Sequence, residues 1–167
     1  MADQLDIRRA SPADASDLSF LILENAEQVL RPHYNKEQWQ VFAAYYSIPA
    51  VERKLRRQTV FCGGREGRIL GTVGLQGDTL VGFYTRYGYS GQGIGTRLLD
   101  HAERFAATTG IDRLHLSSSP EGLPFYRKSG WMEFETKLVY YSGVGFEETR
   151  MEKDLVNLGA PGSLLPA

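Results

Sequence analysis

The sequence has few of the features that mark secreted, membrane-bound or metal-binding proteins. Its single cysteine, Cys62, cannot form an internal disulfide, and its three histidines are too far apart to suggest a zinc site. No uncharged apolar run approaches the roughly 20 residues of a membrane span, and the first residues lack the apolar segment of a secretory signal. We therefore expect a cytoplasmic protein that needs no metal ion and no membrane.

Neither sign of charge is in excess. The 19 basic and 20 acidic residues leave a net charge of -1, so no overall positive field attracts nucleic acid or an anionic membrane. Hydrophobic residues make up 42% of the chain and charged residues 23%, which is the balance of a globular domain rather than a disordered chain. The length suits one domain, which we place over residues 1–158, followed by a flexible tail over 159–167.

The hydrophobic pattern predicts a mixed α/β protein. A first helix runs from Pro12 to Pro32, and Asn35 begins a second helix that Pro49 interrupts, with a further turn or two over 50–57. The remaining expected helices cover 94–109 and 123–129, and the expected strands cover 5–9, 59–62, 68–75, 79–87, 113–117, 131–141 and 146–155.

Short turns at 63–67, 76–78 and 142–145 join successive strands, so most neighbouring strands should be antiparallel. The strands on either side of helix 94–109 should instead be parallel or nearly so, because a helix connects them. In the strand over 131–141, alternation places a set of apolar side chains on one face: Met132, Phe134, Leu138 and Tyr140.

A glycine-rich loop, Ser90-Gly91-Gln92-Gly93-Ile94-Gly95-Thr96, links a strand to the clearest helix of the chain. Glycine lets the backbone turn sharply and approach a ligand closely. The first amides of the helix have no partner within it and, with the helix dipole, favour a bound anion such as a pyrophosphate.

Three interpretations of this loop compete. A P-loop needs a lysine before the final Ser or Thr, which the Gly95-Thr96 pair lacks. A dinucleotide fingerprint needs a glycine where Thr96 stands and a repeated βαβ pattern, which is absent. A plain turn that uses glycine for geometry alone remains open.

The residues downstream favour a fourth interpretation. After the helix and the strand at Arg113 come Phe125-Tyr126 and Gly130-Trp131. Together with the loop, this run resembles the GCN5-related N-acetyltransferase (GNAT) superfamily, whose motif Arg/Gln-x-x-Gly-x-Gly/Ala is followed by Phe-Tyr and Gly-Phe. The resemblance covers about residues 5–155 and implies a GNAT fold: a mostly antiparallel, twisted sheet of about seven strands, with a splayed parallel pair at the cofactor cleft and flanking helices.

The resemblance also implies acetyl-CoA as the co-substrate, lying between the two splayed strands. Ser90 replaces the family's Arg or Gln, but the backbone amides that bind the pyrophosphate remain. The residues that the resemblance assigns to acetyl-CoA are Phe83, Tyr84, Thr85, Ser90, Gly91, Gln92, Gly93, Ile94, Gly95, Thr96 and Ser118.

In the family an amine attacks the thioester directly, and Tyr126 matches the tyrosine that acts as the acid. No carboxylate lies within 79–85, where many relatives carry a glutamate base, so the base stays open among Glu24, Glu27, His33, Tyr34 and a water chain. The acceptor is an amine of a small molecule or a peptide. Candidates for its pocket, or else for plain core, are Tyr34, Trp39, Tyr45, Tyr140 and Tyr141.

Two alternatives to an N-acetyltransferase stay open, the first of them because of Ser90 and the missing carboxylate. One is an acyl-CoA-binding module without turnover. The other is a structural or interaction domain that uses the loop only as a turn. A homodimer is common in the family and is an expectation by analogy.

Overall fold

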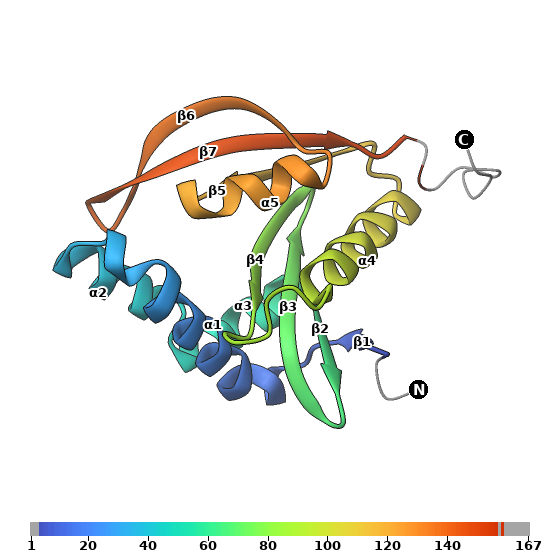
Figure 1. Ribbon diagram of the computed structural model, residues 1–167, viewed down its shortest axis with the longest axis horizontal. Coiled ribbons are helices and arrows are strands. Elements are labelled where there is room, and N and C mark those ends of the chain that lie inside the picture. Colours follow the sequence, from blue (N-terminus) through green and yellow to red (C-terminus); the bar gives the residue numbers. More distant parts are fainter. Residues whose placement is uncertain (1–3, 157, 159–167) are drawn as a thin grey trace.

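A computed structural model describes residues 4–156 and 158 (Figure 1). A seven-stranded sheet has the order β1-β2-β3-β4-β5-β7-β6. Only β4 and β5 pair in parallel; the other neighbours are antiparallel, which confirms the predicted mostly antiparallel sheet with one parallel pair. The strands are β1 (Asp6–Arg9), β2 (Thr59–Arg65), β3 (Arg68–Gln76), β4 (Thr79–Thr85), β5 (Arg113–Ser118), β6 (Met132–Tyr141) and β7 (Val144–Asp154). The expected flexible tail lies outside the described residues.

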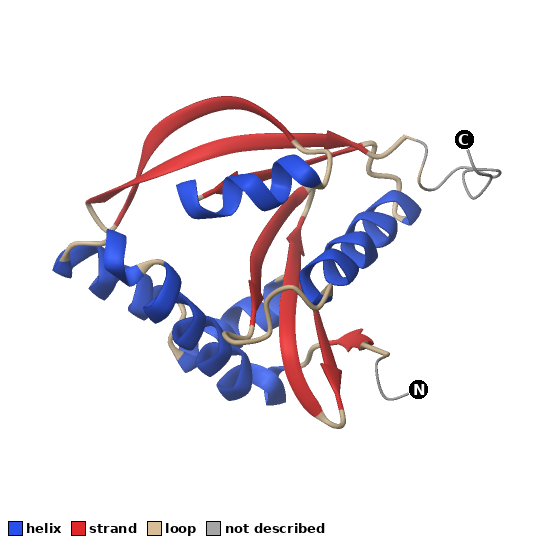
Figure 2. Cartoon of the chain, viewed as in Figure 1, coloured by secondary structure: helices blue, strands red, loops and turns tan. Residues whose placement is uncertain are grey.

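Helices cover both faces of the sheet (Figure 2). On one face, Phe61 and Leu70 belong to a core shared with α4; on the other, Val60 and Ile69 belong to a core shared with α1, α2 and α3. Adjacent residues of one strand therefore serve opposite cores, as the pleat requires. No described helix has the length and apolar character needed to cross a membrane. The helices are α1 (Ala15–Val29), α2 (Lys36–Tyr45), α3 (Ile48–Arg57), α4 (Ile94–Thr108) and α5 (Leu123–Lys128).

The start of α2 agrees with the sequence prediction, whereas Pro49 acts differently from the prediction. Asn35 Oδ1 accepts the Gln38 amide at 2.8 Å, and Gln38 Oε1 accepts the Asn35 amide at 2.9 Å. Pro49 does not interrupt a helix but lies in the first turn of α3, which Ser47 caps. The missing N–H of proline has no helical partner to lose there.

The predicted turn over 63–67 is also too long. The strand β2 continues through Gly63 and Gly64, which pair with β3 across a register shift, and the turn is confined to Glu66 and Gly67. A Cβ on Gly64 would lie 2.2 Å from the carbonyl oxygen of Arg68. This glycine therefore permits close approach of two strands rather than a change of direction.

The predicted single apolar face of β6 is wrong. A register shift between Glu133 and Glu135 lets Met132 pair with Glu152, whereas Leu138 pairs with Glu147. Positions 152 and 147 differ by an odd number, so Met132 and Leu138 lie on opposite faces. Both side chains are exposed on this edge strand.

Candidate active site

The central feature of the site is the separation of β4 from β5. The two strands share the pair Thr79 with His115 and then diverge. In β4, Gly82 and Phe83 together face Val73, because Gly74 pairs with Val81 and Thr72 with Tyr84. This bulge places Gly82 at φ +56°, where glycine is favoured, and bends β4 where the strands part. A cavity of about 910 Å³ is lined by β4 and the carboxyl end of β5.

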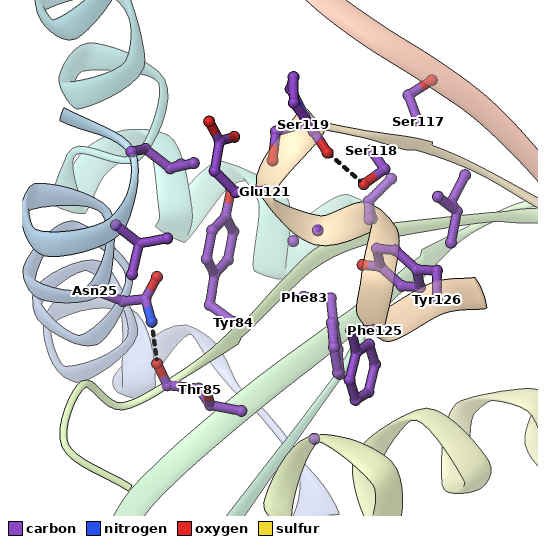
Figure 3. A pocket seen from close by; sticks show the side chains of 18 of the residues that line it. Asn25, Phe83, Tyr84, Thr85, Ser117, Ser118, Ser119, Glu121, Phe125 and Tyr126 are labelled. Carbon is purple, nitrogen blue, oxygen red and sulfur yellow. Dashed lines mark hydrogen bonds between the residues drawn. The ribbon is translucent and has the colours of Figure 1, made fainter. Parts of the chain in front are cut away.

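Most residues that the sequence assigned to acetyl-CoA line this cavity. Gln92 is the exception, because its Oε1 accepts a hydrogen bond of 2.9 Å from Arg65 and it lies outside the lining. Ser118 lines the cavity, although its hydroxyl donates to the carbonyl oxygen of Ser119 at 2.7 Å (Figure 3). The lining members are Phe83, Tyr84, Thr85, Ser90, Gly91, Gly93, Ile94, Gly95, Thr96 and Ser118.

The glycine loop leads directly into the N-terminus of α4. Gly91 and Gly93 both have φ +77°, and Gly93 is the N-cap residue of α4. The first amide of this helix with an intrahelical partner is that of Arg97, which donates to Gly93 at 3.1 Å. The amides over 94–96 have no partner within the helix, and the helix dipole adds a partial positive charge there. Such an arrangement of amides suits an anion without requiring a nearby cationic side chain.

Ser90 offers a test of this geometry. It is exposed and lines the cavity beside the loop. Ser90→Arg should tighten CoA binding by up to about tenfold, because a guanidinium that reaches a phosphate forms charge-assisted hydrogen bonds. Calorimetric titration at low and high salt checks this, since the gain should shrink as salt screens the pair. Unchanged affinity at low salt would mean that position 90 does not face the phosphates.

An aromatic cluster surrounds Tyr126 on one side of the cleft (Figure 3). Its ring centroid lies 5.6 Å from that of Phe125, 6.0 Å from that of Phe83 and 6.1 Å from that of Trp131. The Tyr126 hydroxyl makes no hydrogen bond to any residue in the described part of the chain. Burial raises the pKa of this hydroxyl, so it stays protonated and remains a donor at neutral pH.

The other end of the cavity lies between α2 and the β6–β7 hairpin. Of the predicted acceptor-pocket residues, Tyr34, Tyr45 and Tyr141 line it, whereas Trp39 and Tyr140 do not. Trp39 stacks on Phe42 at 5.9 Å, and Tyr140 is 65% exposed on the edge strand.

Among the candidate bases, His33 and Tyr34 line the cavity, and Glu24 and Glu27 do not. Glu27 instead pairs with Arg31 at 2.7 Å, one helical turn away. Asn25, also on α1, donates to the carbonyl oxygen of Thr85 at 2.9 Å and so ties α1 to the end of β4 (Figure 3).

Glu121, Glu147 and Glu148 line the cavity, and the sequence assigned no role to any of them. Glu148 on β7 accepts a hydrogen bond of 2.9 Å from the Tyr141 hydroxyl, and burial raises the pKa of Glu148. Glu121 lies 3.9 Å from His33 through one oxygen, and its other oxygen is buried with no hydrogen bond to the described residues. Position 148 lies on the same face of its strand as the buried Phe146. This alternation was the one feature of the sequence that could have indicated that Glu148 points inward. Within the described residues, there is no group of His, Cys, Asp or Glu side chains that could hold a metal ion.

The fold and the cleft together define an acetyltransferase domain. The model of the acetyltransferase (GNAT) domain family matches residues 30–155, so the chain belongs to this family of acetyl-CoA-dependent transferases. Among curated proteins, no sequence matches the chain.

Solved structures share this fold across nearly the whole chain. A GCN5-related N-acetyltransferase from Rhodopseudomonas palustris is 24% identical with a TM-score of 0.84, over 92% of this chain and 98% of that one. The PaiA N-acetyltransferase of Thermoplasma acidophilum, solved with coenzyme A, is 22% identical with a TM-score of 0.72, over 90% and 99% of the two chains. A GNAT-family acetyltransferase from Streptococcus pneumoniae is 21% identical with a TM-score of 0.65, over 90% and 99%. At these identities the likeness concerns the fold.

Proposed function

We propose that the protein transfers the acetyl group of acetyl-CoA to a primary amine by direct attack, with both substrates bound at once. The observation that carries this proposal is a single cavity lined at one end by the α4 glycine loop, along its length by β4 and Tyr126, and at the other end by Tyr34, Tyr141 and Glu148. An anion site, a thioester site and an amine site therefore share one space.

The residues of the chain suit the parts of acetyl-CoA. The amides of Gly91 to Thr96 would bind the pyrophosphate, because unpaired helix N-terminal amides favour anions. Beyond Thr79, β4 has no pairing with β5, so its backbone groups on that side are available to an extended chain such as pantetheine, which would bind like an added strand. The thioester would then lie near Phe83 and Tyr126, which line the cavity where the strands diverge.

Tyr126 would act on the leaving sulfur through its hydroxyl. A free phenol has a pKa near 10 and a thiol one near 8.5, so full proton transfer is already uphill by about 2 kcal/mol. Burial raises the pKa of Tyr126 further, which makes a hydrogen bond to the developing thiolate the more favourable role. Such a bond stabilises charge that appears only as the C–S bond breaks.

Thermal unfolding tests the co-substrate part of the proposal. Acetyl-CoA at about 100 times its Kd should stabilise the folded state by roughly 2.7 kcal/mol, because only the folded state offers the site. A melting temperature unmoved by millimolar acetyl-CoA or CoA would contradict the proposal. Release of free thiol with a panel of amines then separates an enzyme from a binding module, which would bind acetyl-CoA and release none.

A further inference from the structure

Six aromatic side chains that line the acceptor end of the cavity form a closed ring of contacts. Each member contacts the next, with ring centroids between 5.0 and 6.0 Å apart around the circuit. The members come from α2 with its flanking residues and from the β6–β7 hairpin, and all of them line the cavity. In order around the ring they are Tyr34, Phe42, Tyr46, Tyr45, Tyr141 and Phe146.

This ring joins two elements that are far apart in sequence. Gln38 on α2 donates through Nε2 to the carbonyl oxygen of Gly145 in β7 at 2.9 Å, beside the ring. The hairpin tip thus lies against α2, as its position in Figure 1 shows. Because both elements meet over the acceptor end, this end suits a small molecule better than a segment of a folded protein.

The charge within the acceptor end is negative. Glu121, Glu147 and Glu148 line the cavity, and His33 is the only basic side chain among the described lining residues. Burial of Tyr34, and after it the negative charges of Glu121 and Glu148, raise the pKa of Tyr34 to about 12. Lys54 contacts the Tyr45 ring at 3.6 Å but does not line the cavity.

We infer that the acceptor is a small cationic amine with an apolar or aromatic body and without a carboxylate group. This inference rests on the proposed function and specifies its substrate class. Aromatic faces attract an ammonium group and also give an apolar body a surface to bury. The carboxylate of Glu148, fixed by Tyr141, would pair with the ammonium. A carboxylate on the acceptor would instead face Glu148 and Glu121 with like charge.

Matched pairs of acceptors test this inference, with thiol release as the readout. Tyramine and tyrosine share a body and differ in one carboxylate, and so do 1,5-diaminopentane and lysine. In each pair the amine without the carboxylate should have a kcat/KM at least about tenfold higher, because the amino acid suffers like-charge repulsion at the site. Comparing tyramine with 1,5-diaminopentane also shows whether the site favours an amine with an aromatic body or an amine with a second ammonium group.

Glu148→Gln tests the residue that would bind the ammonium. This variant should raise the KM for the best amine by about tenfold and reduce its advantage over the matching amino acid, because one of the repelling charges is gone. Glu37→Gln is the matched control: Glu37 is an exposed carboxylate on α2 that does not line the cavity, and its removal should leave KM unchanged within twofold. Stabilisation of both variants by acetyl-CoA verifies that they fold. If Glu148→Gln does not fold, the two pairs of acceptors, measured on the unmodified protein, still test whether a carboxylate on the acceptor is rejected.

The outcomes separate the inference from the proposed function. Thiol release that is equal or faster with the amino acids, or fastest with a lysine-containing peptide, would overturn the inference and leave the acetyltransferase activity intact. Binding of acetyl-CoA without release for any amine would overturn the proposed function, and the inference with it.

Discussion

Gly93→Val should abolish the stabilisation of the protein by acetyl-CoA. Gly93 is the N-cap of α4 and has φ +77°, which a β-branched residue adopts only with strain of roughly 1–2 kcal/mol. A Cβ at this position meets no atom of the described residues within 4 Å, so the described part of the fold has room for it. Gly93 lines the cavity. The valine side chain would therefore compete for the space in which we place the pyrophosphate. Thermal unfolding with and without acetyl-CoA measures the effect.

The chain offers a matched control in Gly67→Val. Gly67 has φ +76°, and a Cβ there also meets nothing within 4 Å in the part of the chain that the structure describes. It lies in the β2–β3 turn, outside the residues that line the cavity. Both variants should lose a similar amount of intrinsic stability, because the backbone strain is the same. Only Gly93→Val should lose the response to acetyl-CoA. An equal response in the two variants would mean that the pyrophosphate does not approach the loop at Gly93.

The fold was predictable wherever the signal is local. The glycine turns between strands, the Asn35 cap and the apolar stripe of α4 depend on residues within one or two turns of each other. Most errors concern features that depend on a partner strand; the exception is Pro49, whose place in the first turn of α3 is a local feature. Gly64 belongs to a strand because of the Arg68 carbonyl opposite, and the bulge in β6 is a property of its pairing with β7. The spacing of residues along the chain does not show which strand will lie opposite, so neither feature could be predicted from it.

The residues of the site also differ in whether local sequence could predict their positions. The glycine loop and Tyr126 carry short motifs, so their place beside one cavity could be anticipated from the chain. Glu148 carries no motif, and it lies at the cavity because β7 pairs with β5 and because the hairpin lies against α2. The bulge at Gly82 was likewise hidden, since it appears only in the register with β3. The acceptor end is therefore a product of topology, whereas the co-substrate end follows from local sequence.

Tyr126→Phe should lower kcat by about 100-fold while the Kd for acetyl-CoA barely changes. The substitution removes one hydroxyl and keeps the ring, so the contacts with Phe125, Phe83 and Trp131 survive. Because the hydroxyl would interact chiefly with negative charge that develops on sulfur, its loss should affect the transition state and not the bound ground state. The size of the effect is at the lower end for general-acid catalysis. A single-turnover measurement is the appropriate assay, since slow product release would mask part of the loss.

Stability provides an independent check on the same variant. The Tyr126 hydroxyl has no hydrogen-bond partner in the described part of the chain, so its removal leaves no buried group unpaired, and the melting temperature should not fall. Tyr140→Phe is the control for a tyrosine hydroxyl outside the cavity, and its turnover should be unchanged. Full single-turnover activity of Tyr126→Phe would make Tyr126 a packing residue of the aromatic cluster. Loss of activity together with loss of acetyl-CoA binding would instead show that Tyr126 shapes the cleft, because a purely chemical role leaves the Kd intact.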